Sequence, residues 1–165
     1  MSYSFLDPIE ILDRLNLKPD MLAADFGSGH GIFTFLLAEK LKDGLVYAID
    51  VQKSALSVLN SSIVSNKTNN IQIIHSNLEA KNGSQLQDSF LDLVLLINVL
   101  FQTENKDAII NEAKRALKKE GNLLVLENEK LIIPREFKKM AEEIGFSVKK
   151  HFKIGDYFGM VFEKI

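Results

Sequence analysis

Short apolar runs alternate with segments in which apolar residues recur at helical spacing along most of the chain. This alternation is typical of βαβ units and a mostly parallel sheet. The run at 91–97 is almost continuously apolar, as expected of a central parallel strand that helices cover on both faces. The strands expected before the closing segment are residues 21–26, 45–50, 71–75, 91–97 and 123–127.

Apolar stripes between these runs predict the helices that cover the sheet, because one face of such a helix can lie on the strands. Residues 9, 12 and 15 form a shorter stripe, which predicts an amphipathic helix before the first strand. The four longer stripes begin at Phe33, Leu56, Ile109 and Phe137. We expect the helix near Ile109 to run through a cationic last turn at 118–119 and to end at Gly121, since positive charge suits that end of the helix dipole.

Two further β-like runs, residues 146–152 and 157–163, close the chain and are separated by little more than Gly155 and Asp156. So short a connection cannot hold a crossover helix, so the two strands either pair antiparallel or lie far apart. We expect an open, mostly parallel sheet that ends in an antiparallel hairpin, within a single domain of residues 1–165.

The composition limits the number of domains and the classes of partner that can be expected. A chain of 165 residues with 46% apolar and 25% charged residues suits one ordinary globular domain. The net charge of -2 comes from residues of both signs spread along the chain, which argues against nucleic acid or an anionic membrane as partner. A strongly cationic partner-binding surface is therefore not indicated.

The chain contains no cysteine, which excludes disulfides, thiolate metal sites and cysteine nucleophiles. Its three histidines, His30, His75 and His151, are too scattered for a metal site to be expected. No run approaches the ~20 apolar residues that a membrane span needs, and no positive segment leads into an apolar N-terminal stretch. We therefore expect a cytoplasmic protein.

A glycine-rich turn, residues 25–31 (DFGSGHG), joins the first strand to the first long helix. Glycine lacks a Cβ and tolerates positive φ, so Gly27, Gly29 and Gly31 let backbone N–H groups approach a ligand closely. In an open α/β sheet ligands bind beyond the carboxyl ends of the strands, where this turn is expected. Ser28 belongs to the same turn.

Asp50 ends the second strand about 20 residues after the turn, the spacing at which an acid reaches ribose hydroxyls. The turn and the acid together favour a nucleoside-containing ligand. A dinucleotide would need a third glycine where Ile32 stands, and no Gly-Lys-Ser/Thr follows the turn as in a phosphate-binding loop. Asp25 would repel a pyrophosphate but could meet the ammonium group of an amino acid moiety.

The segment 25–31 resembles motif I of the class I S-adenosylmethionine (SAM)-dependent methyltransferases, and the similarity extends over nearly the whole chain. The resemblance implies a three-layer α/β/α Rossmann-like fold with a seven-stranded sheet, SAM as cofactor and S-adenosylhomocysteine as product. Asp50 matches the ribose-binding acid of the family, and Val51 the apolar residue beside the adenine. Residues 90–101 are similar to the fourth-strand motif.

One departure from the family lies after the third strand. Where the family often has an acid that accepts from the adenine amino group, this chain has Asn77, whose amide oxygen can accept the same hydrogen bond without charge. Leu78 would then pack on the adenine ring. The complete set of expected cofactor-binding residues is Asp25, Gly27, Ser28, Gly29, Gly31, Asp50, Val51, Asn77, Leu78 and Asn98.

Two residues are candidates for a further role in methyl transfer. Asn98 either lines the transfer pocket or caps the helix that follows the fourth strand. His30 is the one histidine near the expected site, so it is either the general base or an ordinary polar loop residue. No dedicated base is obligatory, because such a transfer depends mainly on positioning.

The loop after the fourth strand is short and resembles that of small-molecule methyltransferases of ubiquinone and menaquinone biosynthesis. Residues 98–101 (NVLF) lack the Asn/Asp-Pro-Pro-aromatic sequence of base-amino methyltransferases, which disfavours a nucleic-acid base as acceptor. The chain has little material for a lid. Either the pocket is open, or it is completed by residues 2–6, by a second subunit of a homodimer or by a partner protein.

Two other functional classes stay open. One is a regulatory protein that binds SAM without turnover, which the missing lid and the neutral Asn77 make conceivable. The other is a fragment of a nicotinamide-dependent oxidoreductase, which Ile32 and the lack of length for a catalytic domain disfavour.

Overall fold

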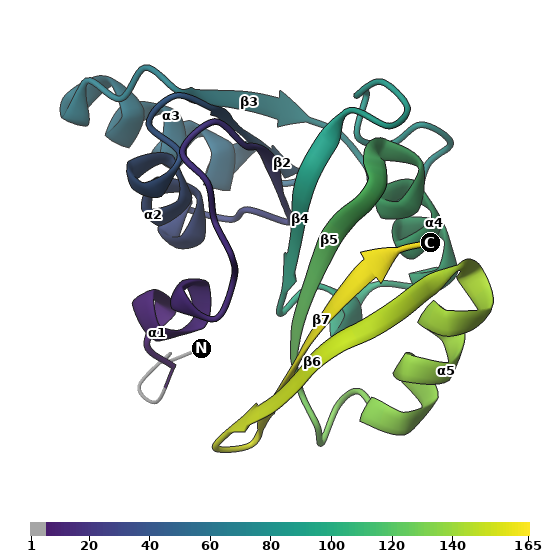
Figure 1. Cartoon of the computed structure of the whole chain (residues 1–165). Helices are drawn as coiled ribbons and strands as arrows, with labels where there is room; N and C mark the ends of the chain where they lie inside the picture. The colour runs from purple at the N-terminus through teal and green to yellow at the C-terminus, as the bar shows by residue number, and fades with distance from the viewer. Residues whose placement is uncertain (1–5) are drawn as a thin grey trace.

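The computed structural model describes residues 6–165, in which seven strands form one sheet with the order β3-β2-β1-β4-β5-β7-β6 (Figure 1). Strands β1 to β5 pair in parallel, and β7 runs antiparallel to both β5 and β6. The elements in chain order are α1 (Pro8–Asp13), β1 (Leu22–Phe26), α2 (Ile32–Lys40), β2 (Leu45–Asp50), α3 (Lys53–Asn66), β3 (Ile71–His75), β4 (Leu91–Ile97), η1 (Leu100–Gln102), α4 (Lys106–Ala116), β5 (Leu117–Asn128), α5 (Pro134–Ile144), β6 (Phe146–Ile154) and β7 (Tyr157–Lys164).

The sheet is the middle of three layers. Successive strand residues point to opposite faces, so Ala24 and Phe26 belong to the core that includes residues of α4 and α5, whereas Ala23 belongs to the core that includes residues of α1 and α2. Helix α3 covers the same face as α2, over Ala48 of β2. Figure 1 shows these two groups of helices on opposite sides of the sheet. The predicted three-layer fold, mostly parallel sheet and closing antiparallel hairpin are confirmed.

The largest departure from the sequence prediction lies after α4. The helix ends at Ala116 and strand β5 begins at once, so residues 118–119 belong to the strand and are not a last helical turn. Leu117 is fully buried and pairs with Leu91 at the start of β4, and the Lys118 ammonium lies 2.8 Å from the Asp92 carboxylate. Pairing with a distant strand therefore outweighs the local fit of two lysines to a helix dipole.

The N-terminal helix is also shorter than its apolar stripe suggested. Asp7 caps α1 by accepting a hydrogen bond from the Ile9 amide, and the helix ends at Asp13. It buries Ile11 and Leu12, while Ile9 is exposed. Leu6 packs into the same core, and residues 2–5 of the expected lid segment lie outside the described residues. None of the helices in residues 6–165 has the length and apolarity that crossing a bilayer requires.

Candidate functional site

The glycine turn follows β1 at the carboxyl edge of the sheet, and all three of its glycines have positive φ, from 53° at Gly29 to 91° at Gly31. Two of them are also required by packing. A Cβ at Gly27 would lie 2.5 Å from a methyl carbon of Val99, and a Cβ at Gly31 would lie 2.3 Å from one of Leu59. At both positions only glycine lets the turn approach its neighbours this closely.

Gly29 differs from the other two, because no heavy atom lies within 4 Å of where its Cβ would be. The space above the middle of the turn is thus free of protein. The neighbouring Ser28 hydroxyl is buried and has no hydrogen-bond partner in the protein. An open backbone cradle beside an unsatisfied hydroxyl suits a polar ligand.

Asp50, at the end of β2, holds the turn from the other side. Its Oδ2 accepts from the Gly29 amide at 2.9 Å and its Oδ1 accepts from the Gln52 amide at 2.8 Å. A carboxylate offers about four lone-pair sites, so each oxygen can accept one further hydrogen bond. The acid is therefore fixed in orientation and still able to receive two hydroxyl groups.

Asp25 is the first residue of the same turn, and its side chain is only 3% exposed. Its Oδ2 accepts from the Thr34 hydroxyl at 2.7 Å. Burial, together with the negative charge of Asp50, raises the pKa of Asp25 from 3.8 to about 6, against the hydrogen bond from Thr34, which lowers it. A cation placed beside this carboxyl group would stabilise its charged form.

Two hollows, of about 290 and 260 Å³, meet at this edge and share Gly27, Asp50, Gln52 and Gln102. Each approaches the volume of a small-molecule site. The first is also lined by Val51, Asn77 and Leu78. The second is also lined by Asp25, Ser28, Gly29, His30, Gly31 and Asn98. Every residue expected to bind a cofactor thus borders one hollow or both.

The residues expected around adenine differ in their exposure and in their free hydrogen-bonding capacity. Val51 is 59% exposed, whereas Leu78 is buried. The Asn77 amide oxygen already accepts from the Glu79 backbone at 2.9 Å, so the local turn uses part of its acceptor capacity. A second hydrogen bond to that oxygen is still available.

The candidates for methyl transfer lie in the second hollow. His30 is exposed there. Asn98 has a φ of 55°, and its amide donates to the Leu126 carbonyl at 2.9 Å. Helix α4 is capped by a different residue, Asn105, whose side chain accepts from the Ala108 amide.

Two residues of this edge were missed by sequence reasoning. Gln102 borders both hollows, and nothing in its sequence context indicated it. Glu127 lies near the end of β5, is fully buried, and accepts from the Val99 and Leu100 amides at 2.8 and 2.6 Å. A single acid at the end of the apolar run 123–126 was a usable indication.

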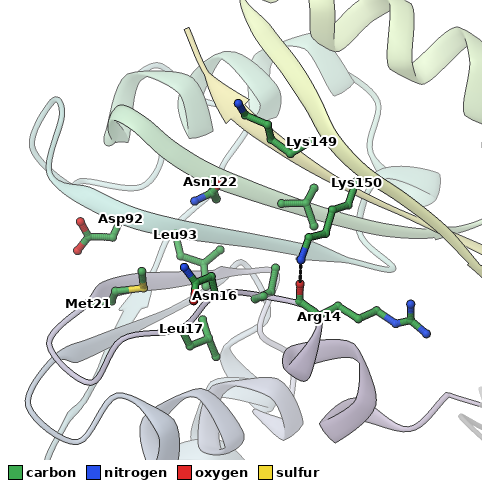
Figure 2. Close-up of a pocket in the computed structure, with 11 residues that line it drawn as sticks. Arg14, Asn16, Leu17, Met21, Asp92, Leu93, Asn122, Lys149 and Lys150 are labelled. Atoms are coloured by element: carbon green, nitrogen blue, oxygen red, sulfur yellow. Dashed lines mark hydrogen bonds between the residues drawn. The ribbon is translucent and has the colours of Figure 1, made fainter.

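A further pocket, of about 100 Å³, lies away from the glycine turn (Figure 2). It is lined in part by Asp92, at the start of β4, and its charged groups are largely engaged within the chain. Lys150 donates to the Arg14 carbonyl at 2.7 Å, Lys149 lies 2.8 Å from Glu163, and Asp92 accepts from Lys118 and from the Leu22 amide. Its small volume and paired charges make it a poor cofactor site.

A family model described as a methyltransferase domain matches residues 17–164. A search of curated proteins gives no match.

Solved structures share the architecture. A SAM-dependent methyltransferase from Aquifex aeolicus is 21% identical, with a TM-score of 0.88 over 98% of this chain and 91% of its own. The cyclase SpnF is 13% identical, with a TM-score of 0.85 over 95% of this chain and 80% of its own. A chain from the complex between the Haloferax volcanii Trm112 methyltransferase activator and a methyltransferase is also 13% identical, with a TM-score of 0.82 over 94% and 87%. These likenesses establish the fold.

Proposed function

Since the chain belongs to the methyltransferase domain family, whose model matches residues 17–164, we propose that it transfers the methyl group of SAM to a small-molecule acceptor. The family and the fold together imply SAM as the methyl donor. The observation that carries the proposal is the position of Asp50, which is fixed by two backbone amides between two hollows.

We assign the first hollow to the adenine and the second to the methionine part of SAM. Asp50 would accept from the ribose hydroxyls, and Leu78 and Val51 would enclose the adenine ring, with Asn77 accepting from its amino group. Asp25 would face the methionine ammonium, which would favour the ionised form of a carboxyl group whose pKa burial has raised. The open space above Gly29 would receive the remainder of the cofactor.

When bound, SAM would supply an activated methyl group for the acceptor, and S-adenosylhomocysteine would be the product. The protein's own contribution is mainly alignment, because holding the reacting groups in line makes the reaction effectively unimolecular. The amide side chains of Asn98 and Gln102 can orient an acceptor by hydrogen bonds without adding charge. His30 is the candidate base for an acceptor that must lose a proton.

A small molecule suits the acceptor better than a nucleic acid. The chain has a net charge of -2, and Lys149, Lys150 and Lys153 of the outer strand β6 are each bonded to other groups of the chain. They do not form the unpaired cationic surface that phosphate backbones require. Because a methyltransferase activator accompanies one similar structure, we also propose that a second subunit or a partner protein completes the open side of the pocket.

Calorimetric titration with SAM, S-adenosylhomocysteine and NADH tests the cofactor. We expect both sulfur compounds to bind and NADH not to bind. Mass spectrometry should then detect S-adenosylhomocysteine formed with the ultrafiltered, small-molecule fraction of a cell extract.

The other outcomes separate the alternatives. Binding of NADH without SAM would indicate an oxidoreductase fragment. Binding of SAM without turnover in any fraction would indicate a regulatory protein or another chemistry on this fold. Turnover only with the macromolecular fraction would refute the small-molecule acceptor.

A further inference from the structure

We propose that Glu127 is a positioning residue of the methyl-transfer site, which its carboxylate shapes by fixing the turn at residues 98–102. This role rests on the proposed function, but the contacts that support it all lie within the chain. It assigns a role to a buried acid that lines neither hollow.

Glu127 reaches the turn through two short hydrogen bonds to one oxygen. Its Oε1 accepts from the Val99 and Leu100 amides at 2.8 and 2.6 Å. These amides begin the short helix η1, whose first N–H groups have no partners within the helix. A carboxylate at that position makes charge-assisted bonds, which are about twice as strong as neutral ones.

The turn needs such support because its first residue is strained. Asn98 has a φ of 55°, a left-handed conformation that most residues avoid, although Asn tolerates it better. A strained residue persists only where its surroundings determine its conformation. Here β5 supplies that restraint twice, through the Leu126 carbonyl, which accepts from the Asn98 amide, and through Glu127.

The position of this turn matters because its side chains line both hollows. Val99 packs against Gly27 of the glycine turn and lines the first hollow. Asn98 lines the second hollow, and Gln102 lines both. Any shift of the turn would therefore move three wall residues at once, against both halves of the cofactor site.

Fold stability alone gives little reason for an acid at this position. Glu127 is fully buried, its Oε2 has no hydrogen-bond partner among residues 6–165, and burial raises its pKa from 4.5 to about 7 although the charge of Lys106 opposes this shift. Burying a charged group with an unsatisfied oxygen is unfavourable. Retention of an unfavourable group beside a ligand-sized hollow is typical of functional sites.

The test uses Glu127→Gln in the whole chain, with Glu120→Gln on the exposed part of the same strand as matched control. The glutamine keeps an acceptor for the turn but weakens both bonds and adds an amide group where Oε2 has no partner. We expect amide hydrogen exchange at Val99 and Leu100 to rise about tenfold in the ligand-free protein, from the loss of charge-assisted bonds. Exchange at Val94 and Leu95 within β4 should stay unchanged, because the turn should open locally while the sheet stays folded.

Affinity and turnover provide the second measurement. Well below the unfolding temperature, Glu127→Gln should bind S-adenosylhomocysteine several-fold more weakly and should form it about tenfold more slowly from SAM and the small-molecule fraction of the extract, while Glu120→Gln matches the wild type. If exchange rises equally at all four amides, or if the variant binds and turns over like the wild type, Glu127 is not a positioning residue. If the wild type binds neither SAM nor its product, the proposed function fails, and the exchange data still decide whether Glu127 fixes the turn.

Discussion

The acids at the two ends of the parallel strands have different partners. At the amino end, Asp92 accepts from the Leu22 amide and from the Lys118 ammonium, at 2.8 Å each. At the carboxyl end, Asp25, Asp50 and Glu127 form no ion pair with a lysine, arginine or histidine in residues 6–165. They accept instead from backbone amides and from one hydroxyl group.

This difference separates an acid that is neutralised within the fold from the acids that we assign to the cofactor site or to its support. Asp92 has its charge neutralised within the chain. The charged forms of Asp25 and Glu127 are disfavoured, because burial raises the pKa values of these groups to about 6 and about 7. Features that reduce stability are common at functional sites, and here such a feature, the burial of acidic groups, occurs at the carboxyl edge of the sheet.

The largest expected effect comes from filling the cradle above the glycine turn. Gly29→Val should abolish SAM binding, because the side chain would occupy the open space and strain a left-handed residue. Gly155→Val is the matched control, since Gly155 has a φ of 56° and equally open surroundings in the hairpin turn. Both variants should lose roughly 1 to 2 kcal/mol of stability, but calorimetry should show lost binding only for Gly29→Val. Normal binding by that variant would place the ligand elsewhere.

The next effect is a pH dependence that only the carboxyl edge should produce. Between the ordinary and the raised pKa of a buried acid, the folded protein binds more protons than the unfolded chain, so the free energy of unfolding falls as pH rises. For Glu127 the fall should span pH 4.5 to about 7 and amount to at most about 3 kcal/mol. The hydrogen bonds from the η1 amides and the charge of Lys106 oppose the shift and limit its size.

Denaturant unfolding at several pH values checks this dependence. Glu127→Gln should remove the fall in stability between pH 4.5 and about 7, whereas Asp25→Asn should remove the fall between pH 3.8 and about 6, so only the Glu127 variant should flatten the range from about 6 to about 7. Asp92→Asn serves as the comparison from the amino edge and should leave both parts in place. A wild-type stability that does not change between pH 4.5 and 7 would contradict the raised pKa of Glu127.

A smaller effect is expected from removing the acid that faces both hollows. Asp50→Ala should weaken SAM binding by about 1 to 3 kcal/mol, since it removes charge-assisted acceptors for the ribose and releases the Gly29 amide. Asp92→Ala removes an acid with the same number of hydrogen bonds at the other edge. It should reduce stability and leave the affinity measured by calorimetry unchanged. Unaltered affinity in Asp50→Ala would refute the ribose assignment.

The residues at the carboxyl edge were also easier to predict from the sequence than those at the amino edge. The glycine turn and Asp50 are each defined by a local pattern at the end of a strand, so spacing alone predicted that they would lie together. The function of Glu127 depends on contacts with residues 27 and 28 positions away along the chain, which no local pattern contains. The error at residues 118–119 has the same origin, because the pairing of Leu117 with Leu91 decides where α4 ends.

The smallest effect should come from the ion pairs of the amino edge themselves. Lys149→Ala removes a pair with Glu163 at 2.8 Å in which both side chains are partly exposed, at 49% and 31%. Such pairs contribute about 0.2 to 1 kcal/mol, because water and salt screen them and ordering two long side chains opposes them. Thermal unfolding should therefore shift only slightly, the shift should disappear at high salt, and SAM affinity should not change. A large loss of affinity would mean that this edge takes part in binding, and the division between the two edges would then be wrong.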